Sequence, residues 1–409
     1  MNSVSDHPPT TADLQVSAAA LRGELARALD AQGLLEDPGW RRAVQTVPRH
    51  RFVAGFYTDT GRHDQEGLPI WEPVTQNIDP GRWLEGAYSD TTLITQFDGT
   101  ETDWNRPAPR AGGAPTSSST LPSLVLRMWL DAEVAEGHNV LEIGTGTGYS
   151  TALVCERLGD RGDVMSLEVD PARLAQAADA LNACGYAVGL AVADGLHGYW
   201  PHAPYDRIVA ACSVRIVPAA WLAQTRSGGK ILTTLSGWLY GYARVLLTVT
   251  DPGTAHGPLL PGTISFMAAR LQERPAPGNP ADWDALTRNL PAEPTRHDPA
   301  RLEQGTDEAF FGRFLAQLTT PHAQLLTADE DTLHLIDVTD GSAATLTRHH
   351  DTWHVHQTGP TRLWDAIQTT WDTWDQAGRP GPQHFHLTIT HGRQNIAHTT
   401  TPDLSFPLI

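Results

Sequence analysis

Hydrophobic and polar residues at the start of the chain alternate with the period of an α-helix. Between Leu14 and Ala31, Leu21, Leu25 and Leu29 recur at every fourth position, which predicts a helix with one apolar face. A second short helix is predicted over Trp40–Thr46, because Pro48 cannot continue it. These patterns predict an N-terminal helical cap over residues 1–56.

A regular alternation of strand and helix patterns comes after a helical stretch at Leu121–Ala132. The predicted strands are Asn139–Ile143, Val164–Val169, Gly189–Ala193 and Arg207–Ala211, and the predicted helices are Thr151–Leu158, Pro171–Ala183 and Ala219–Thr225. Strands Lys230–Leu235 and Arg244–Val249 should then form an antiparallel pair. This alternation is typical of a doubly wound α/β domain, which we place at residues 57–270.

The last third of the chain has a different pattern. Residues 271–318 are rich in proline and predict a linker with helical segments. Residues 319–409 carry short strand patterns and one helix, and they predict a separate, small α+β domain. Trp364, Ile367, Trp371 and Trp374 repeat at helical spacing, which is most simply a core face, with peptide binding as the alternative.

The composition of the chain limits the classes of partner and the cellular compartments that we expect for the protein. The formal net charge of -18 disfavours nucleic acid. The cysteines are odd in number and lack a CxxC spacing, as expected for a protein of the reducing cytoplasm; they are Cys155, Cys184 and Cys212. No apolar run approaches the roughly 18 residues that span a bilayer, and the first residues are polar, so neither membrane insertion nor secretion is expected.

Histidines alternate along two predicted strands, as His354 with His356 and His384 with His386. Pairing of these strands would make a four-histidine patch. No carboxylate spacing or metal motif accompanies them, so solvated polar faces are the expectation and no metal site is predicted.

The run Val140–Gly148 has the pattern of a buried strand that enters a glycine-rich turn before a helix. Gly144, Gly146 and Gly148 have a G-x-G-x-G spacing, whereas a dinucleotide fingerprint has G-x-G-x-x-G. Glycines allow a ligand to approach the backbone closely, and free N–H groups at the helix start face it. The turn therefore predicts a nucleoside site without a pyrophosphate.

Two carboxylates strengthen this interpretation. Glu168 ends the next strand, where it can accept both ribose hydroxyls, and Asp194 comes after the third, where it can accept from an adenine amino group. The alternative is that both are idle, solvated carboxylates; their shared edge of the sheet argues against it. The predicted ligand is S-adenosylmethionine, bound by Glu142, Gly144, Thr145, Gly146, Gly148, Tyr149, Glu168, Val169, Asp194 and Gly195. The predicted fold is a Rossmann-like class I S-adenosylmethionine methyltransferase with a seven-stranded doubly wound sheet.

These residues occur with a VPRHxFV segment at Val47–Val53, with Ala87–Asp90 and with Tyr205–Ile208, and together they resemble the protein L-isoaspartate O-methyltransferase family. The resemblance covers about residues 14–270 and leaves the C-terminal third uncovered. It implies methyl transfer to a carboxyl group of an isoaspartyl or aspartyl residue in a peptide.

The family carries a Thr-Ile-Ser-x-Pro motif whose serine hydroxyl lies in the active site. Aligned on Pro122, the serine position here is Thr120, and Ser119 or Ser118 are alternatives because the hydroxyl run leaves the register open. The departure from serine puts ordinary repair activity in doubt. A helix N-cap is the structural alternative for Thr120.

The substrate is expected to contact His50, Tyr88, Asp90 and Trp104, with Trp83–Asp90 and the loop Phe97–Ala114 as lid elements. The family that this chain resembles includes a subset of proteins with an extra C-terminal domain. The resemblance to this subset implies modification of ribosomally made lanthipeptide, lasso and ester-crosslinked peptides. The preferred hypothesis is therefore esterification of an aspartate in a macrocyclic precursor peptide, giving a succinimide or isoaspartate. General isoaspartyl repair and small-molecule methylation are the alternatives, and the sequence leaves open whether the chain dimerises.

Overall fold

The structure, a computed structural model, describes residues 11–350 and 352–409. The chain divides into two compact units, Met1–Ala211 and Cys212–Ile409. The boundaries predicted after residues 56, 270 and 318 do not coincide with this division. Residues 1–10 of the predicted cap lie outside the described residues. In the described ranges, no helix is long and apolar enough to cross a membrane.

The first unit begins with the predicted helices, α1 (Thr11–Ala31) and α2 (Pro38–Thr46). Helix α2 has proline in its first turn, and the Asp37 carboxylate accepts the Gly39 N–H at 2.6 Å, an N-cap that satisfies one free donor. Asp37 also pairs with Arg157 at 2.8 Å. This ion pair ties the start of α2 to α5 (Tyr149–Leu158), the helix after the glycine turn.

A small antiparallel sheet, which the sequence patterns did not predict, comes next. Its strands are β1 (Gly55–His63), β2 (Pro69–Thr75), β3 (Leu93–Phe97), β4 (Arg110–Ala111) and β5 (Pro115–Ser119), in the order β4-β2-β1-β3-β5. Helix α3 (Pro80–Ala87) lies between β2 and β3 in the chain. The strand β5 is a run of proline, threonine and serine without apolar residues, so its periodicity gave no strand signal.

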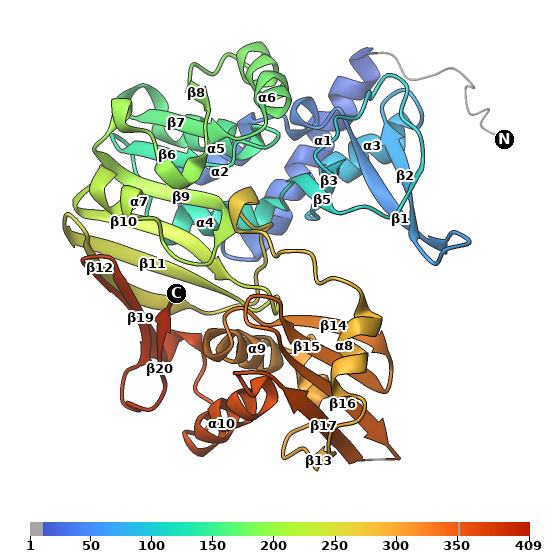
Figure 1. Ribbon diagram of the computed structural model, residues 1–409. Helices are drawn as coiled ribbons and strands as arrows, with labels where there is room; N and C mark the ends of the chain where they lie inside the picture. Colours follow the sequence, from blue (N-terminus) through green and yellow to red (C-terminus); the bar gives the residue numbers. More distant parts are fainter. Residues whose placement is uncertain (1–10, 351) are drawn as a thin grey trace. The chain divides into compact units, whose positions relative to one another are not determined.

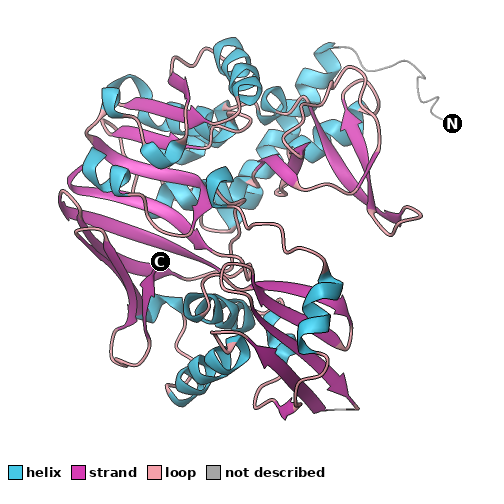
Figure 2. Cartoon of the chain, viewed as in Figure 1, coloured by secondary structure: helices cyan, strands magenta, loops and turns pink. Residues whose placement is uncertain are grey.

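The remainder of the first unit contains the predicted alternation, visible in green in Figure 1 and by element type in Figure 2. Its elements are α4 (Pro122–Asp131), β6 (Asn139–Ile143), α5, β7 (Asp163–Glu168), α6 (Pro171–Ala183), β8 (Gly189–Val192) and β9 (Tyr205–Val214). Strands β9, β6, β7 and β8 pair in parallel in that order. The α/β prediction is confirmed here, because buried apolar runs between helices fix a parallel sheet.

The second unit contains an antiparallel sheet. Helix α7 (Ala219–Gln224) precedes β10 (Thr225–Ser236), β11 (Tyr242–Asp251) and β12 (Thr254–Leu260). The predicted antiparallel pairing of β10 with β11 is confirmed. Strand β12 then pairs with β18 (Phe385–Thr390), which continues to β19 (Arg393–His398) and β20 (Ser405–Leu408). The strands predicted for a separate C-terminal domain therefore divide between two sheets, because the end of the chain returns to β12. The sheet that contains these strands has ten strands, in the order β20-β19-β18-β12-β11-β10-β9-β6-β7-β8, so the predicted count of seven is not confirmed.

The second sheet of this unit has the order β13-β17-β16-β15-β14. Its strands are β13 (Glu293–Pro294), β14 (Gln324–Asp329), β15 (Thr332–Asp337), β16 (Ser342–His349) and β17 (Thr352–Thr358). Helices α8 (Pro280–Thr287), α9 (Asp307–Thr319) and α10 (Leu363–Gln376) complete the unit. His354 and His386 lie on strands of different sheets, so the four-histidine patch does not form.

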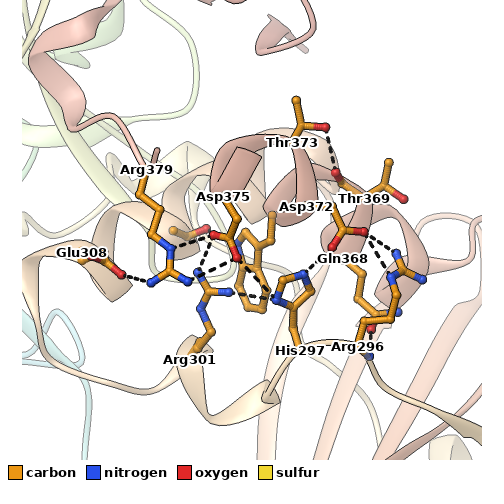
Figure 3. A network of polar contacts seen from close by, with 12 residues as sticks. Arg296, His297, Arg301, Glu308, Gln368, Thr369, Asp372, Thr373, Asp375 and Arg379 are labelled. Carbon is orange, nitrogen blue, oxygen red and sulfur yellow. Dashed lines mark hydrogen bonds and ion pairs between the residues drawn. The ribbon is translucent and has the colours of Figure 1, made fainter. Parts of the chain in front are cut away.

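Helix α10 presents an apolar face and a charged face. Trp364, Trp371 and Trp374 are almost completely buried, which confirms that the tryptophan repeat is a core face. On the polar side, Asp372 contacts Arg296 at 2.9 Å and His297 at 2.8 Å. Figure 3 shows how the neighbouring Asp375 is shared by Arg301 and Arg379. This network fastens the segment that precedes α9 to α10.

Candidate active site

The glycine turn after β6 has the conformation that its sequence predicts. Gly144, Gly146 and Gly148 have φ values of 96°, 55° and 85°, in the left-handed region that side chains with a Cβ avoid. Gly148 is the N-cap of α5, so the first N–H groups of the helix come directly after the turn. The N–H groups of Gly144, Gly146 and Gly148 are bonded within the protein, and the first N–H groups of α5 come directly after them at the end of β6.

The Glu168 side chain lies against this turn. Its Oε2 accepts the Gly146 N–H at 2.9 Å, and its Oε1 accepts the N–H groups of Val169 at 2.9 Å and Asp170 at 3.1 Å. The carboxylate is therefore held at the carboxyl end of β7, beside the glycines. Val169, the next residue, is an exposed apolar side chain at 43% relative accessibility.

Asp194 and Gly195 complete the same edge. Strands β6, β7 and β8 run parallel, so their carboxyl ends meet at one side of the sheet. The Asp194 Oδ1 accepts the Leu196 N–H at 2.9 Å. A Cβ at Gly195 would lie 2.2 Å from Ile143 Cγ2, so only glycine permits this turn to pack on the end of β6. A glycine cradle flanked by two carboxylates fits the nucleoside of S-adenosylmethionine.

Three members of the predicted cofactor set lie beneath the turn. Glu142 is 1% exposed, and one of its oxygens accepts the hydroxyls of Thr151 and Ser166. Burial raises the pKa of this carboxyl, and these hydroxyl bonds oppose the increase. The Thr145 hydroxyl bonds that of Ser166 at 2.7 Å, and Tyr149 is 2% exposed. Their burial gives these side chains a packing role under the turn; direct contact with the cofactor stays a prediction.

The hydroxyl strand β5 lies beside the glycine turn. The Ser118 carbonyl oxygen is 3.6 Å from the position that a Cβ of Gly146 would occupy. Strand alternation separates the hydroxyls, because Ser117 and Ser119 are buried while Ser118 and Thr120 are half-exposed. Ser119 therefore points away from the face that Ser118 and Thr120 share. The catalytic role of Thr120, Ser119 or Ser118 stays a prediction.

Thr120 is not the N-cap of α4. The N-cap position is Leu121, and the free helix donor at Ser123 is accepted by Asp90 Oδ1 at 2.8 Å. The Leu121 N–H is accepted by the Thr92 hydroxyl at 3.3 Å. Capping is thus performed by the segment before β3, which leaves the Thr120 hydroxyl for another role. Asp90 has this structural role, and its predicted substrate contact stays a prediction.

Arg49, from the VPRHxFV segment, organises the loops around Thr120. The side chain is fully buried, and burial lowers the pKa of its guanidinium to about 10. Its Nη1 donates to the Ser89 carbonyl at 2.7 Å, and its Nη2 donates to the carbonyls of Thr91, Ser119 and Thr120 at 3.1–3.2 Å. This role was not predicted from the sequence, although the motif that contains Arg49 was the available signal. Arg49 joins the loop after α3 to the end of β5.

His50 and Tyr88, both predicted to contact substrate, contact each other. The His50 Nδ1 is 2.7 Å from the Tyr88 hydroxyl. Burial, with smaller contributions from Arg51 and Arg22, lowers the pKa of His50 from the ordinary 6.5 to about 4. The neutral imidazole then accepts the hydrogen bond that the phenol donates. Burial also raises the pKa of Tyr88, which keeps that proton in place.

This pair predicts a loss of stability in mild acid. The folded protein resists protonation of His50 between the ordinary pKa of 6.5 and the folded value of about 4, while the unfolded chain takes up the proton. The contribution of His50 to the free energy of unfolding should be fully present above about pH 6.5 and should decrease as the pH falls toward 4. Urea denaturation at several pH values should show a steeper decrease for wild type than for His50→Gln. His63→Gln, at an exposed position on β1, is the control, and equal slopes for wild type and His50→Gln would contradict the assignment.

The first half of the predicted lid loop is anchored by its side chains. Arg173, on α6, forms an ion pair with Glu101, and the Gln96 amide contacts Glu101 at 2.8 Å and Asp170 at 2.9 Å. Trp104 is half-buried and packs on β1, with its ring 5.3 Å from that of Tyr57. These contacts fasten the loop to the helix after Glu168. No group of three or more metal-binding side chains occurs among the residues with described positions.

Comparisons with known proteins agree with this geometry. Residues 95–237 match the family model described as protein-L-isoaspartate(D-aspartate) O-methyltransferase. A protein-L-isoaspartate O-methyltransferase of Ignicoccus hospitalis is 32% identical over 207 residues, covering 50% of this chain and 77% of the relative. A similarly named protein of Archaeoglobus fulgidus is 34% identical over 46% of this chain and 68% of its own length.

Structural comparison gives the same result for the fold alone. A solved protein-L-isoaspartate O-methyltransferase aligns with 92% of this chain and 99% of its own, at 20% identity and a TM-score of 0.51. The family assignment rests on the match to the Ignicoccus hospitalis protein. It agrees with the glycine turn and with the carboxylates at the ends of β7 and β8. The chain belongs to the protein-L-isoaspartate O-methyltransferase family, whose members use S-adenosylmethionine.

Proposed function

We propose that this protein transfers a methyl group from S-adenosylmethionine to a carboxylate of an isoaspartyl or aspartyl residue in a peptide or protein. The observation that carries the proposal is the approach of β5 to the glycine turn, with the Ser118 carbonyl 3.6 Å from the Cβ position of Gly146. It brings the half-exposed face of Ser118 and Thr120 next to the predicted cofactor cradle.

The chemistry requires positioning more than proton transfer. A carboxylic acid with a pKa of about 4 is already ionised at neutral pH, so a strong general base is unnecessary. S-adenosylmethionine supplies an electrophilic methyl carbon. The Thr120 hydroxyl would donate a hydrogen bond to one carboxylate oxygen and so aim the other at this carbon. A carbon–oxygen bond forms as the carbon–sulfur bond breaks, and the electron pair of that bond leaves on sulfur.

The methyl ester is more reactive than the carboxylate it replaces. Esterification neutralises the carboxylate and creates a better leaving group, so the backbone nitrogen of the following residue can close a succinimide with loss of methanol. Hydrolysis of the imide then gives aspartyl or isoaspartyl products. Neither step requires a residue of this chain.

Two biological settings fit this reaction. The names of the relatives favour repair of isoaspartyl residues in proteins. Two features support the other setting, the tailoring of a macrocyclic, ribosomally made peptide. Thr120 stands at the position where the family motif has serine, and the chain continues beyond residue 237, where the match to the family model ends. In that setting the C-terminal residues would bind the peptide. Incubation with cofactor and either a linear isoaspartyl peptide or a crosslinked aspartyl peptide, followed by mass spectrometry, separates the two.

Substitution of Thr120 tests the assigned hydroxyl. Thr120→Val keeps the shape and removes the donor, so kcat should fall about 10- to 100-fold, which corresponds to roughly 1.4–2.7 kcal/mol of lost positioning. Thr120→Ser should retain activity. Ser117→Ala is the control, because that hydroxyl contacts Thr95 at 3.3 Å on the other side of β5. A wild-type kcat in Thr120→Val together with a large loss in Ser118→Ala would move the role to Ser118.

A further inference from the structure

A cavity of about 470 Å³ opens in the small antiparallel sheet of the first unit. Its volume lies in the range of ligand pockets in proteins. The walls come from β1, from α3 and from the segment that leads into β3. Phe56, Trp71 and Ile94 supply apolar surface, and Arg82 and Glu85 lie at the same cavity.

The cavity coincides with an open strand edge. Strand β1 lies between β2 and β3 in the sheet order, and its register with β2 extends from Gly55 to His63. Its register with β3 contains the single pair Tyr57↔Ile94. Beyond Tyr57, the edge of β1 that faces β3 therefore has no strand partner within residues 11–350 and 352–409. An unpaired edge of this kind can take up an extended peptide through main-chain hydrogen bonds.

The cavity wall is also continuous with the hydroxyl strand. Ile94 and Leu93, which line the cavity, pair across the sheet with Ser118 and Ser119 of β5. Thr92, another lining residue, accepts the Leu121 N–H immediately after Thr120. A peptide in the cavity would therefore lie one strand away from the half-exposed hydroxyl face.

We propose that this cavity binds the residues flanking the methylated aspartyl residue, with the peptide extended along the free edge of β1 and an apolar side chain against Phe56 and Trp71. This inference rests on the proposed function, and it adds the site at which the protein recognises the peptide substrate. Arg82 is accompanied by Asp59 and Glu85 in the lining, so the cavity has no excess positive charge to select an acidic flank. An uncharged segment with an aliphatic or aromatic side chain matches it better.

Filling the cavity tests the proposal. Thr58 is half-buried and lines the cavity, and its hydroxyl donates to the Glu72 carbonyl at 3.4 Å. Thr58→Trp should raise KM for an isoaspartyl hexapeptide about tenfold, while kcat and the Kd for S-adenosylmethionine stay unchanged. Thr60→Trp is the matched control: Thr60 lies two residues along the same strand, its hydroxyl donates to the Ile70 carbonyl, and it is outside the lining.

Peptide truncation gives a second test that depends on no variant. Wild-type protein should show a higher KM for peptides cut back to the reacting residue on one side, and Thr58→Trp should abolish this difference. Equal KM values for the hexapeptide and both truncated forms, or an unchanged KM in Thr58→Trp with normal cofactor binding, would overturn the subsite. Failure of the proposed function gives a different result, because wild type would then methylate none of these peptides.

Discussion

Replacing Arg49 with methionine should abolish methyl transfer and lower the free energy of unfolding by roughly 3 kcal/mol or more. The guanidinium is fully buried and donates to the carbonyls of Ser89, Thr91, Ser119 and Thr120. Hydrogen bonds from a charged donor contribute about 1.5–3 kcal/mol each, and methionine would leave several buried acceptors without a partner. Chemical denaturation and a methyl-transfer assay measure the two effects.

The neighbouring Arg51 provides a control for Arg49. Arg51 lies two residues along the same segment with an exposed side chain, so Arg51→Met should change stability little. Arg49→Lys keeps a charge but lacks the planar fork that reaches several carbonyls, so it should recover stability only in part. A fully active, fully stable Arg49→Met variant would remove Arg49 from its assigned role in positioning Thr120.

The second large effect is expected at Glu168. Glu168→Ala should weaken binding of S-adenosylmethionine about 10- to 100-fold, because it removes the carboxylate that we predict to accept the ribose hydroxyls. It also removes the bond that Oε2 accepts from Gly146 N–H at 2.9 Å, so the glycine turn should lose part of its order. Isothermal titration calorimetry of the cofactor measures the change directly.

Asp163→Asn is the control for this substitution, because Asp163 is an exposed carboxylate at the other end of the same strand. Both substitutions remove one negative charge from β7, but only Glu168 lies beside the glycine turn. Equal losses of affinity in the two variants would indicate a general charge effect. An unchanged Kd in Glu168→Ala would exclude Glu168 from the cofactor site.

The sequence by itself determined the α/β core and the conformation of the glycine turn. The predicted bounds Asn139–Ile143 and Pro171–Ala183 are those of β6 and α6. Local signals suffice there, because buried apolar runs fix the strands, prolines begin the helices, and positive φ values require the glycines. The edge shared by Glu168 and Asp194 results from parallel pairing, since each residue lies at the carboxyl end of its strand.

Tertiary structure decided which hydroxyls of the run are buried and which carbonyls Arg49 contacts. The alternation that turns Ser119 inward and leaves Thr120 half-exposed appears only once β5 pairs with β3. The carbonyls that Arg49 contacts lie 40 to 71 residues away in the chain. Likewise, β18 pairs with β12 although more than a hundred residues separate them, which divided the predicted C-terminal domain between two sheets. Contacts between distant segments depend on how the elements pack, and a local pattern of polar and apolar residues contains no record of that packing.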